Sequence, residues 1–256
     1  MKKIFGLFCI LGLFFGLCAC VFADEKKAPK PVTKIEIETR DHFILVGDLY
    51  FAKEKKPPKP LVLLLHSYGS RALEWYELPR ELRVDNFNVL ALDLRGHGRS
   101  VRNSDFKYKS KNTFTNEDWA RLPFDIIDSI DYVAKNYPRI NTDEIYIVGA
   151  DIGANAAILA ARAMRIKPKK MVLISPYSEI KGMSIVSVLP HLKDIPMMVM
   201  ASRASSYSYA QADIISRLIS APMQFRVYSE GGSGLLLLKR NPISYQEILQ
   251  YIISGK

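Results

Sequence analysis

Short, uninterrupted apolar runs alternate with helix-like segments along this chain, and this alternation restricts the fold more than any other feature. The runs Leu61–Leu65, Asn88–Leu94 and Glu144–Val148 predict strands covered on both faces, because a half-exposed strand would alternate apolar with polar residues. Parallel strands must be joined by crossovers, which are usually helices. The pattern therefore predicts an α/β fold with a doubly wound, mostly parallel sheet. Helices are predicted at Leu73–Val84, Trp119–Asn136 and Ile152–Met164.

Further strands are predicted on both sides of these central runs. Ile35 and Ile37 alternate with polar residues, which indicates an edge strand, and Phe43–Phe51 is its expected hairpin partner. The short stretch between the strand ending near Ile174 and the next one leaves no room for a cap domain. Residues 33–256 are therefore predicted to form one domain. The remaining predicted elements are strands at Met171–Ile174, Met197–Ala201 and Gln224–Tyr228, and helices at Ile214–Ile219 and Ser244–Ile253.

The first residues have the composition of an export signal. Two lysines precede the apolar run Ile4–Phe22, and small residues offer a cleavage site after Ala23. Residues 1–23 are thus predicted to be a signal peptide, and the Lys/Pro-rich residues 24–32 a tether. The protein is expected to be exported to a periplasmic or extracellular location.

The three cysteines of the chain all lie in this first stretch. The segment around Cys20 resembles a bacterial lipobox, so lipidation at Cys20 and a lipoprotein anchor are an alternative to cleavage after Ala23. An uncleaved anchor is a third alternative, since the apolar run reaches the roughly 17–25 residues that a membrane helix needs. After cleavage at Ala23 no cysteine would remain for a disulfide, a zinc ligand or a thiol nucleophile. No metal site and no cofactor is predicted.

The chain is basic, with a formal net charge of +10. Its lysines gather in clusters mixed with Pro, Ser or Ala, which is typical of solvated loops. A positive surface suits an anionic cell envelope, whereas nucleic acid is not expected as a partner of an exported chain without a recognition motif. The ligand remains an unknown small molecule or envelope component, and the oligomeric state remains open.

Three of the predicted strands end in segments rich in glycine and polar residues. These segments are His66–Ser70, Asp93–Ser100 and Gly149–Gly153. In an open α/β sheet, ligands bind at the carboxyl ends of the strands. A functional site is therefore predicted where the three segments meet.

These segments resemble the α/β-hydrolase superfamily, in particular its small capless bacterial members of the esterase and peptidase type. The resemblance runs from about Val32 to Ile253, and the string D-L-R-G-H-G-R-S at Asp93–Ser100 is its most specific part. It implies an α/β-hydrolase fold without a cap domain. It also implies a hydrolase-like activity, on esters or peptides, that uses no cofactor.

The third segment corresponds to the nucleophile elbow of that superfamily, a strained strand-to-helix turn with the sequence Gly-x-Ser-x-Gly. The elbow glycines are present as Gly149 and Gly153, but Asp151 stands at the position of the nucleophile. The resemblance also implies an oxyanion hole made by the backbone N–H groups of Tyr68 and Ile152. Aspartate tolerates a left-handed turn, yet its carboxylate would oppose an oxyanion at that hole.

The other two triad positions are also changed. The superfamily carries its acid after the strand predicted at Met197–Ala201, where this chain has Ala204 and Ser205. It carries its histidine after Gln224–Tyr228, where this chain has Ser233. Acyl transfer by a serine needs both the hydroxyl and a base. The sequence therefore predicts a catalytically inactive pseudo-hydrolase with a binding or scaffold role at the cell envelope.

A divergent hydrolase is the alternative. It would act on esters or, with Asp151 as the nucleophile, on alkyl halides or epoxides. The elbow aspartate has that role in haloalkane dehalogenases and epoxide hydrolases, although those enzymes also need a histidine. His191 and Glu179 are candidates for a relocated base and a relocated acid. His66 and His97 are interpreted as structural residues of the strand-end turns.

Overall fold

The computed structural model describes residues 31–254. The signal peptide predicted at residues 1–23, the lipidation candidate Cys20 and most of the predicted tether lie outside the described residues. From Pro31 onward the chain clusters into a single unit.

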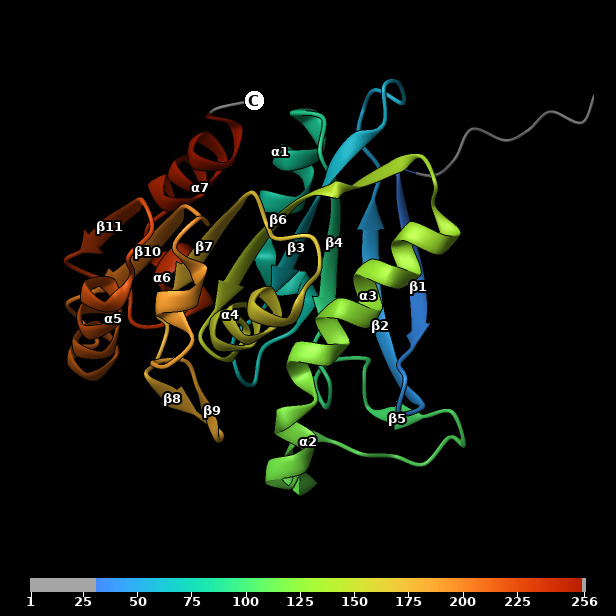
Figure 1. Ribbon diagram of the computed structural model, residues 1–256, viewed down its shortest axis with the longest axis horizontal. Coiled ribbons are helices and arrows are strands. Elements are labelled where there is room, and N and C mark those ends of the chain that lie inside the picture. Colours follow the sequence, from blue (N-terminus) through green and yellow to red (C-terminus); the bar gives the residue numbers. More distant parts are fainter. Residues whose placement is uncertain (1–30, 255–256) are drawn as a thin grey trace, which may run out of the picture. The chain divides into compact units, whose positions relative to one another are not determined.

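A mixed sheet of nine strands runs through the described residues (Figure 1). Its order is β1-β2-β4-β3-β6-β7-β10-β11, and β5 pairs with β2. β2 pairs antiparallel with both β1 and β4, whereas every pair from β4 to β11 is parallel. The predicted doubly wound, mostly parallel sheet is confirmed. The strands are β1 (Val32–Glu38), β2 (Phe43–Tyr50), β3 (Lys59–Leu65), β4 (Asn88–Asp93), β5 (Arg102–Asn103), β6 (Ile140–Ala150), β7 (Lys170–Ile174), β10 (Met197–Ser202) and β11 (Met223–Tyr228).

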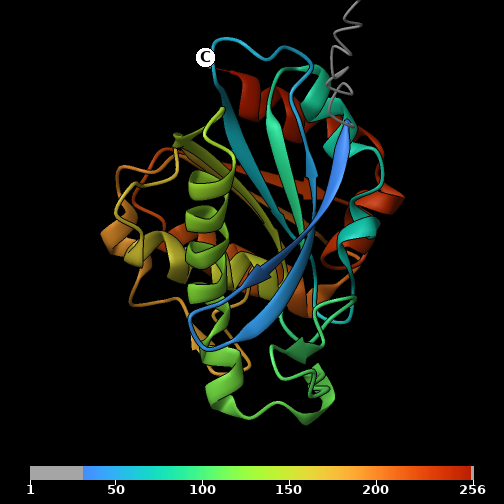
Figure 2. The ribbon, with the colours of Figure 1, turned by 90° about the vertical axis from the view of Figure 1, so that its right-hand side faces the viewer.

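Helices cover both faces of the sheet, and each face buries its own apolar cluster (Figures 1 and 2). The residues of Leu61–Leu65 are fully buried, as the uninterrupted apolar run predicted. One face packs against α2 (Asn116–Ala120), α3 (Leu122–Asn136), α4 (Ile152–Ala163) and α5 (Ser206–Leu218). The other packs against α1 (Leu78–Val84), α6 (Leu235–Arg240) and α7 (Ile243–Ile253).

Two of the predicted helices are each interrupted just before a proline. The helix predicted at Leu73–Val84 is a 3-10 turn, η1 (Ala72–Trp75), followed by α1, and Tyr76 between them has φ 51°. The helix predicted at Trp119–Asn136 is likewise divided into α2 and α3 at Arg121. Proline lacks an N–H and fits best in the first turn of a helix, so Pro79 and Pro123 begin new helices instead of continuing old ones.

Three other elements differ from the sequence-based expectation. β6 begins at Ile140 rather than Glu144, because an irregularity in its pairing with β3 lets the strand continue backward. α5 begins at Ser206, several residues before the predicted helix. α6 was not predicted, since its run of four leucines has no helical periodicity.

The excursion between β7 and β10 is short, as expected. It contains a two-stranded hairpin, β8 (Glu179–Ile180) and β9 (Met183–Ser184), and the 3-10 helix η3 (Leu189–Leu192). These elements do not amount to a cap domain within the described residues. No helix in residues 31–254 is both long and apolar enough to cross a membrane.

Candidate functional site at the strand ends

The turn between β6 and α4 is a strained elbow. Asp151 stands there with φ 55° and ψ −118°, a conformation that costs a residue other than glycine about 1–3 kcal/mol. A Cβ on Gly153 would lie 2.3 Å from the Leu65 carbonyl oxygen. A Cβ on Gly149 would lie 2.6 Å from the Gly153 carbonyl oxygen. Only glycine fits at these two positions, so the elbow is a consequence of the close packing of α4 against β3 and β6.

The Asp151 carboxylate lies at the two backbone N–H groups that the resemblance assigns to an oxyanion hole. Burial raises the pKa of Asp151 to about 6, and hydrogen bonds from the backbone of Tyr68 and Ile152 oppose that rise. Oδ1 of Asp151 is buried and has no hydrogen-bond partner of normal geometry among the described residues. At neutral pH the carboxylate is therefore mostly ionised, and its negative charge lies near the two N–H groups that the resemblance assigns to an oxyanion hole.

Tyr177 lies near both Asp151 and Ser233, the residue at the position predicted for the histidine. Burial raises the pKa of Tyr177 and the Asp151 charge adds to that rise, whereas the nearby hydroxyls of Ser208 and Ser233 oppose it. Gly234 is also adjacent, since a Cβ on it would lie 3.4 Å from the Asp151 Cβ. The structure thus brings Ser233 and its loop to the elbow.

Two serine hydroxyls hold this loop in place. Ser175 Oγ accepts a hydrogen bond from the Gly234 N–H at 3.0 Å, and Ser67 Oγ accepts one from the Leu235 N–H, also at 3.0 Å. Sequence reasoning did not assign roles to Ser67, Ser175 or Tyr177. Their place just after the buried strands β3 and β7 was the signal available, because ligand-binding residues gather at such strand ends.

The other predicted groups are not brought to the elbow. Ser205 stands at the start of α5, and Ala204 is exposed in the turn before it. No contact in the described chain joins either residue to Asp151. Glu179 and His191 are exposed, and neither side chain makes a hydrogen bond or an ion pair within residues 31–254.

His66 and His97 are buried and make structural hydrogen bonds, and Nε2 of His97 is left without a partner among the described residues. His66 Nε2 accepts the Leu94 N–H at 2.9 Å, so its proton is on Nδ1, which lies 2.8 Å from the Ser67 carbonyl oxygen. Burial, followed by the neighbouring His97, lowers the pKa of His66 to about 4. Burial also lowers the pKa of His97, whose Nδ1 lies 2.9 Å from the Arg95 carbonyl oxygen. Both rings are neutral at pH 7, and neither contacts Asp151.

The string D-L-R-G-H-G-R-S forms a network of ion pairs beneath the site. Arg95 is only 3% exposed and makes bidentate pairs with Asp125 and Asp41, while its guanidinium lies 4.4 Å from the centroid of the Phe43 ring. A second arginine, Arg99, pairs with Asp93 and bidentately with Asp48. This motif therefore braces β2, β4 and α3 and supplies no group to the elbow.

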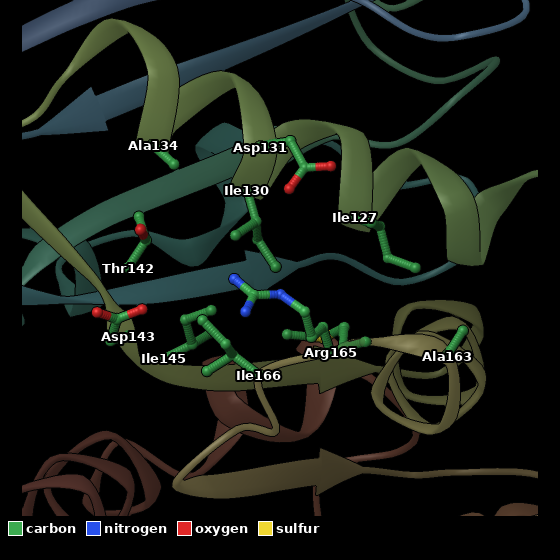
Figure 3. A pocket seen from close by; sticks show the side chains of 11 residues that line it. Ile127, Ile130, Asp131, Ala134, Thr142, Asp143, Ile145, Ala163, Arg165 and Ile166 are labelled. Atoms are coloured by element: carbon green, nitrogen blue, oxygen red, sulfur yellow. The ribbon is translucent and has the colours of Figure 1, made fainter.

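A pocket of about 360 Å³ lies at the other end of β6, between α3 and the loop after α4. Figure 3 shows the Arg165 side chain pointing into it, with Asp131 and Asp143 on the surrounding elements. At about 3.3 Å per residue along a strand, Ile145 in its wall is roughly 20 Å from Asp151. The pocket is therefore separate from the elbow. Within residues 31–254 no group of His, Cys, Asp and Glu side chains is arranged to hold a metal ion.

Three features define an α/β-hydrolase fold: the strand order of the sheet, the elbow that requires glycine on both sides of Asp151, and the strand-end loops held by hydrogen bonds to Ser67 and Ser175. A family model described as serine aminopeptidase, S33 (Hydrolase_4) matches residues 56–230. The chain belongs to this family. A search of the curated proteins finds no match.

Solved structures of hydrolases are similar to the chain across most of its length. A hydrolase from Pseudomonas aeruginosa is 15% identical, with a TM-score of 0.69 over 87% of this chain and 99% of that one. Dienelactone hydrolase from Anabaena variabilis is 14% identical, with a TM-score of 0.65 over 87% and 95%. A serine hydrolase without a lid from Xanthomonas campestris is 15% identical, with a TM-score of 0.64 over 88% and 94%. At these identities the likeness shows the fold.

Proposed function

We propose that this member of the hydrolase family binds a ligand at the elbow and does not turn over esters by acyl transfer. The proposal rests chiefly on the residue at the elbow: Asp151 stands there with φ 55°, and its carboxylate lies near the backbone N–H groups of Tyr68 and Ile152, which lower its pKa. These donors would otherwise stabilise a tetrahedral oxyanion, an effect worth about 3–4 kcal/mol per donor. With a carboxylate already there, an oxyanion would meet repulsion.

The groups around Asp151 also lack the means to move a proton. The four histidines of the chain are His42, His66, His97 and His191, and none hydrogen-bonds to Asp151. The phenol of Tyr177 has a raised pKa and is therefore a poor base at neutral pH. Hydroxyls and an ionised carboxylate, with no histidine beside them to relay a proton, are suited to hydrogen bonding with a ligand.

The test is an esterase assay of the purified protein and its Asp151→Ala variant on p-nitrophenyl acetate and butyrate. We expect both proteins to match the buffer rate, because neither has a nucleophile paired with a base. Turnover by the wild-type protein that Asp151→Ala abolishes would contradict the proposal.

An alkylation experiment on the same protein distinguishes this function from the alternative in which Asp151 is the nucleophile. Attack by that carboxylate on an alkyl bromide would form an ester bond, expel bromide and add the alkyl group to the mass of the protein. After incubation with 1-bromobutane, we expect mass spectrometry to find no butyl group attached to Asp151. An adduct on Asp151 that is missing in Asp151→Ala would support the divergent hydrolase.

We further propose that the protein acts outside the cytoplasm, as a periplasmic or extracellular protein or an anchored lipoprotein. The support is the order of two lysines, an apolar run and small residues before Asp24. Expression of the full chain in a bacterial host is expected to yield an exported protein whose N-terminus is Asp24. A lipid-modified N-terminal Cys20 would indicate the lipoprotein form, and an intact Met1 on a cytoplasmic protein would contradict export.

A further inference from the structure

The hairpin between β7 and β10 carries Lys181 in its tight turn, where the backbone conformation is constrained. Its turn consists of Lys181 and Gly182, with φ of 52° and 76°. Positive φ at both central residues is what a tight two-residue hairpin turn needs, and lysine is an unusual residue for such a position. The turn thus fixes the position of the Lys181 Cα, from which the side chain extends.

Lys181 extends toward aromatic rings on other segments. Its Nζ lies 4.9 Å from the centroid of the Tyr68 ring and 5.7 Å from that of the Trp119 ring. A second ammonium, Lys111 Nζ, lies 5.9 Å from the Tyr68 centroid. Both distances to Tyr68 are in the range of cation–π attraction. Two lysines from separate segments therefore lie within cation–π range of one partly exposed phenol ring, and the backbone N–H of that residue lies near Asp151.

Neither lysine has a carboxylate partner in the described chain. The ion pairs of residues 31–254 include Lys34, Lys59 and Lys109 but neither Lys111 nor Lys181. Aromatic rings attract the ammonium groups but do not neutralise them. The pair therefore leaves a positive potential that an anion would satisfy.

A groove of about 670 Å³ is lined by Lys181 and the rest of the β8–β9 hairpin on one side and by helices α2, α3 and α4 on the other. Much of its lining is apolar, and its volume is that of a typical small-molecule site. Glu117 is the one carboxylate among its lining residues, so an anionic head would be repelled there and attracted at the lysine edge. The apolar part of the lining includes Ala120, Pro123, Phe124, Leu159 and Met183.

We propose that this groove binds a single-chain anionic amphiphile. Its carboxylate lies between Lys181 and Lys111 beside Tyr68, and its apolar chain follows the groove between α3 and the β8–β9 hairpin. The inference rests on the proposed function, since it names the class of ligand that a binding protein of this shape would hold. It adds a recognition site next to the elbow whose charged groups lie outside the triad positions.

The experiment is calorimetric titration of the purified protein with laurate below its micellar concentration. Laurate is expected to bind, whereas dodecanol, which lacks the charge, and acetate, which lacks the chain, are expected to bind at least about tenfold more weakly. Lys181→Asn removes the charge with a residue that tolerates positive φ, and it is expected to raise the laurate Kd about tenfold. Ala120→Trp fills the groove without a change of charge and is expected to raise the Kd of laurate by a similar factor.

Lys135→Gln is the matched control, because Lys135 is an exposed lysine at the far end of α3. It is expected to leave the laurate Kd unchanged. Equal binding of laurate and dodecanol, or equal Kd values for Lys181→Asn and Lys135→Gln, would overturn the inference. Laurate has no bond to hydrolyse, so ester turnover by the protein would refute the proposed function without affecting this measurement.

Discussion

Replacement of Arg95 by methionine is expected to lower the free energy of unfolding by about 3–5 kcal/mol, because it leaves the buried Asp125 without its partner and takes the main partner from the half-buried Asp41. Asp125 is 2% exposed, and its pKa is already raised to about 6 by burial even with Arg95 in contact. Asp41 has its pKa held at about 2, since the Arg95 hydrogen bonds outweigh the effect of burial. Removal of the guanidinium takes this compensation from both carboxylates at once.

Urea denaturation at pH 7 measures this effect, and Arg217→Met is its control. Arg217 pairs only with Asp213, one turn away on α5, and its side chain is 76% exposed. Exposed pairs of this kind contribute little, so the control is expected to change the free energy of unfolding by less than about 1 kcal/mol. Equal losses in Arg95→Met and Arg217→Met would show that the buried network does not brace the sheet.

Replacement of Asp151 by asparagine is expected to raise the free energy of unfolding by about 2–3 kcal/mol at pH 7.5, because burial penalises the ionised carboxylate. The pKa of Asp151 rises from 3.8 to about 6 on folding. The folded state thus binds a proton more tightly than the unfolded state, and wild-type stability falls as the pH rises from about 4 to 6. The gain from asparagine is full above that window and absent below it.

The pH dependence separates this cause from a change in packing. Thermal or urea unfolding of both proteins at pH 3.5 and pH 7.5 provides the comparison, with exposed Asp194→Asn as the matched control. The control is expected to be within about 0.5 kcal/mol of the wild type at both pH values. A gain for Asp151→Asn that is equal at both pH values would contradict the electrostatic explanation.

The sheet could be predicted from sequence because its central strands are buried on both faces and flanked by clear turns. Leu61–Leu65 and Asn88–Leu94 have the length of a strand and are flanked by turn residues, which favours strands over buried helix segments. Helix continuity was harder, because apolar periodicity persists across the breaks near Tyr76 and Arg121. Pro79 was the local signal for the first break, and it was outweighed by the pattern.

The candidate site could be predicted only where a motif fixes the backbone. Gly149 and Gly153 mark the elbow because a side chain at either would collide with neighbouring backbone. Tyr177 and Ser175 have no such motif, and their approach to Asp151 depends on how β7 is placed beside β6 in the sheet. Contacts of this kind are tertiary, and a single sequence contains no local pattern for them.

The packing around Gly149 and Gly153 separates the shape of the elbow from its chemistry. Both glycines are required by neighbouring carbonyl oxygens of the fold, and neither requirement involves the side chain at Asp151. The backbone therefore presents whatever residue occupies that position to the same two N–H donors. One side chain can change from nucleophile to anionic ligand group while the scaffold remains the same, so a match in shape to active hydrolases carries no information about turnover.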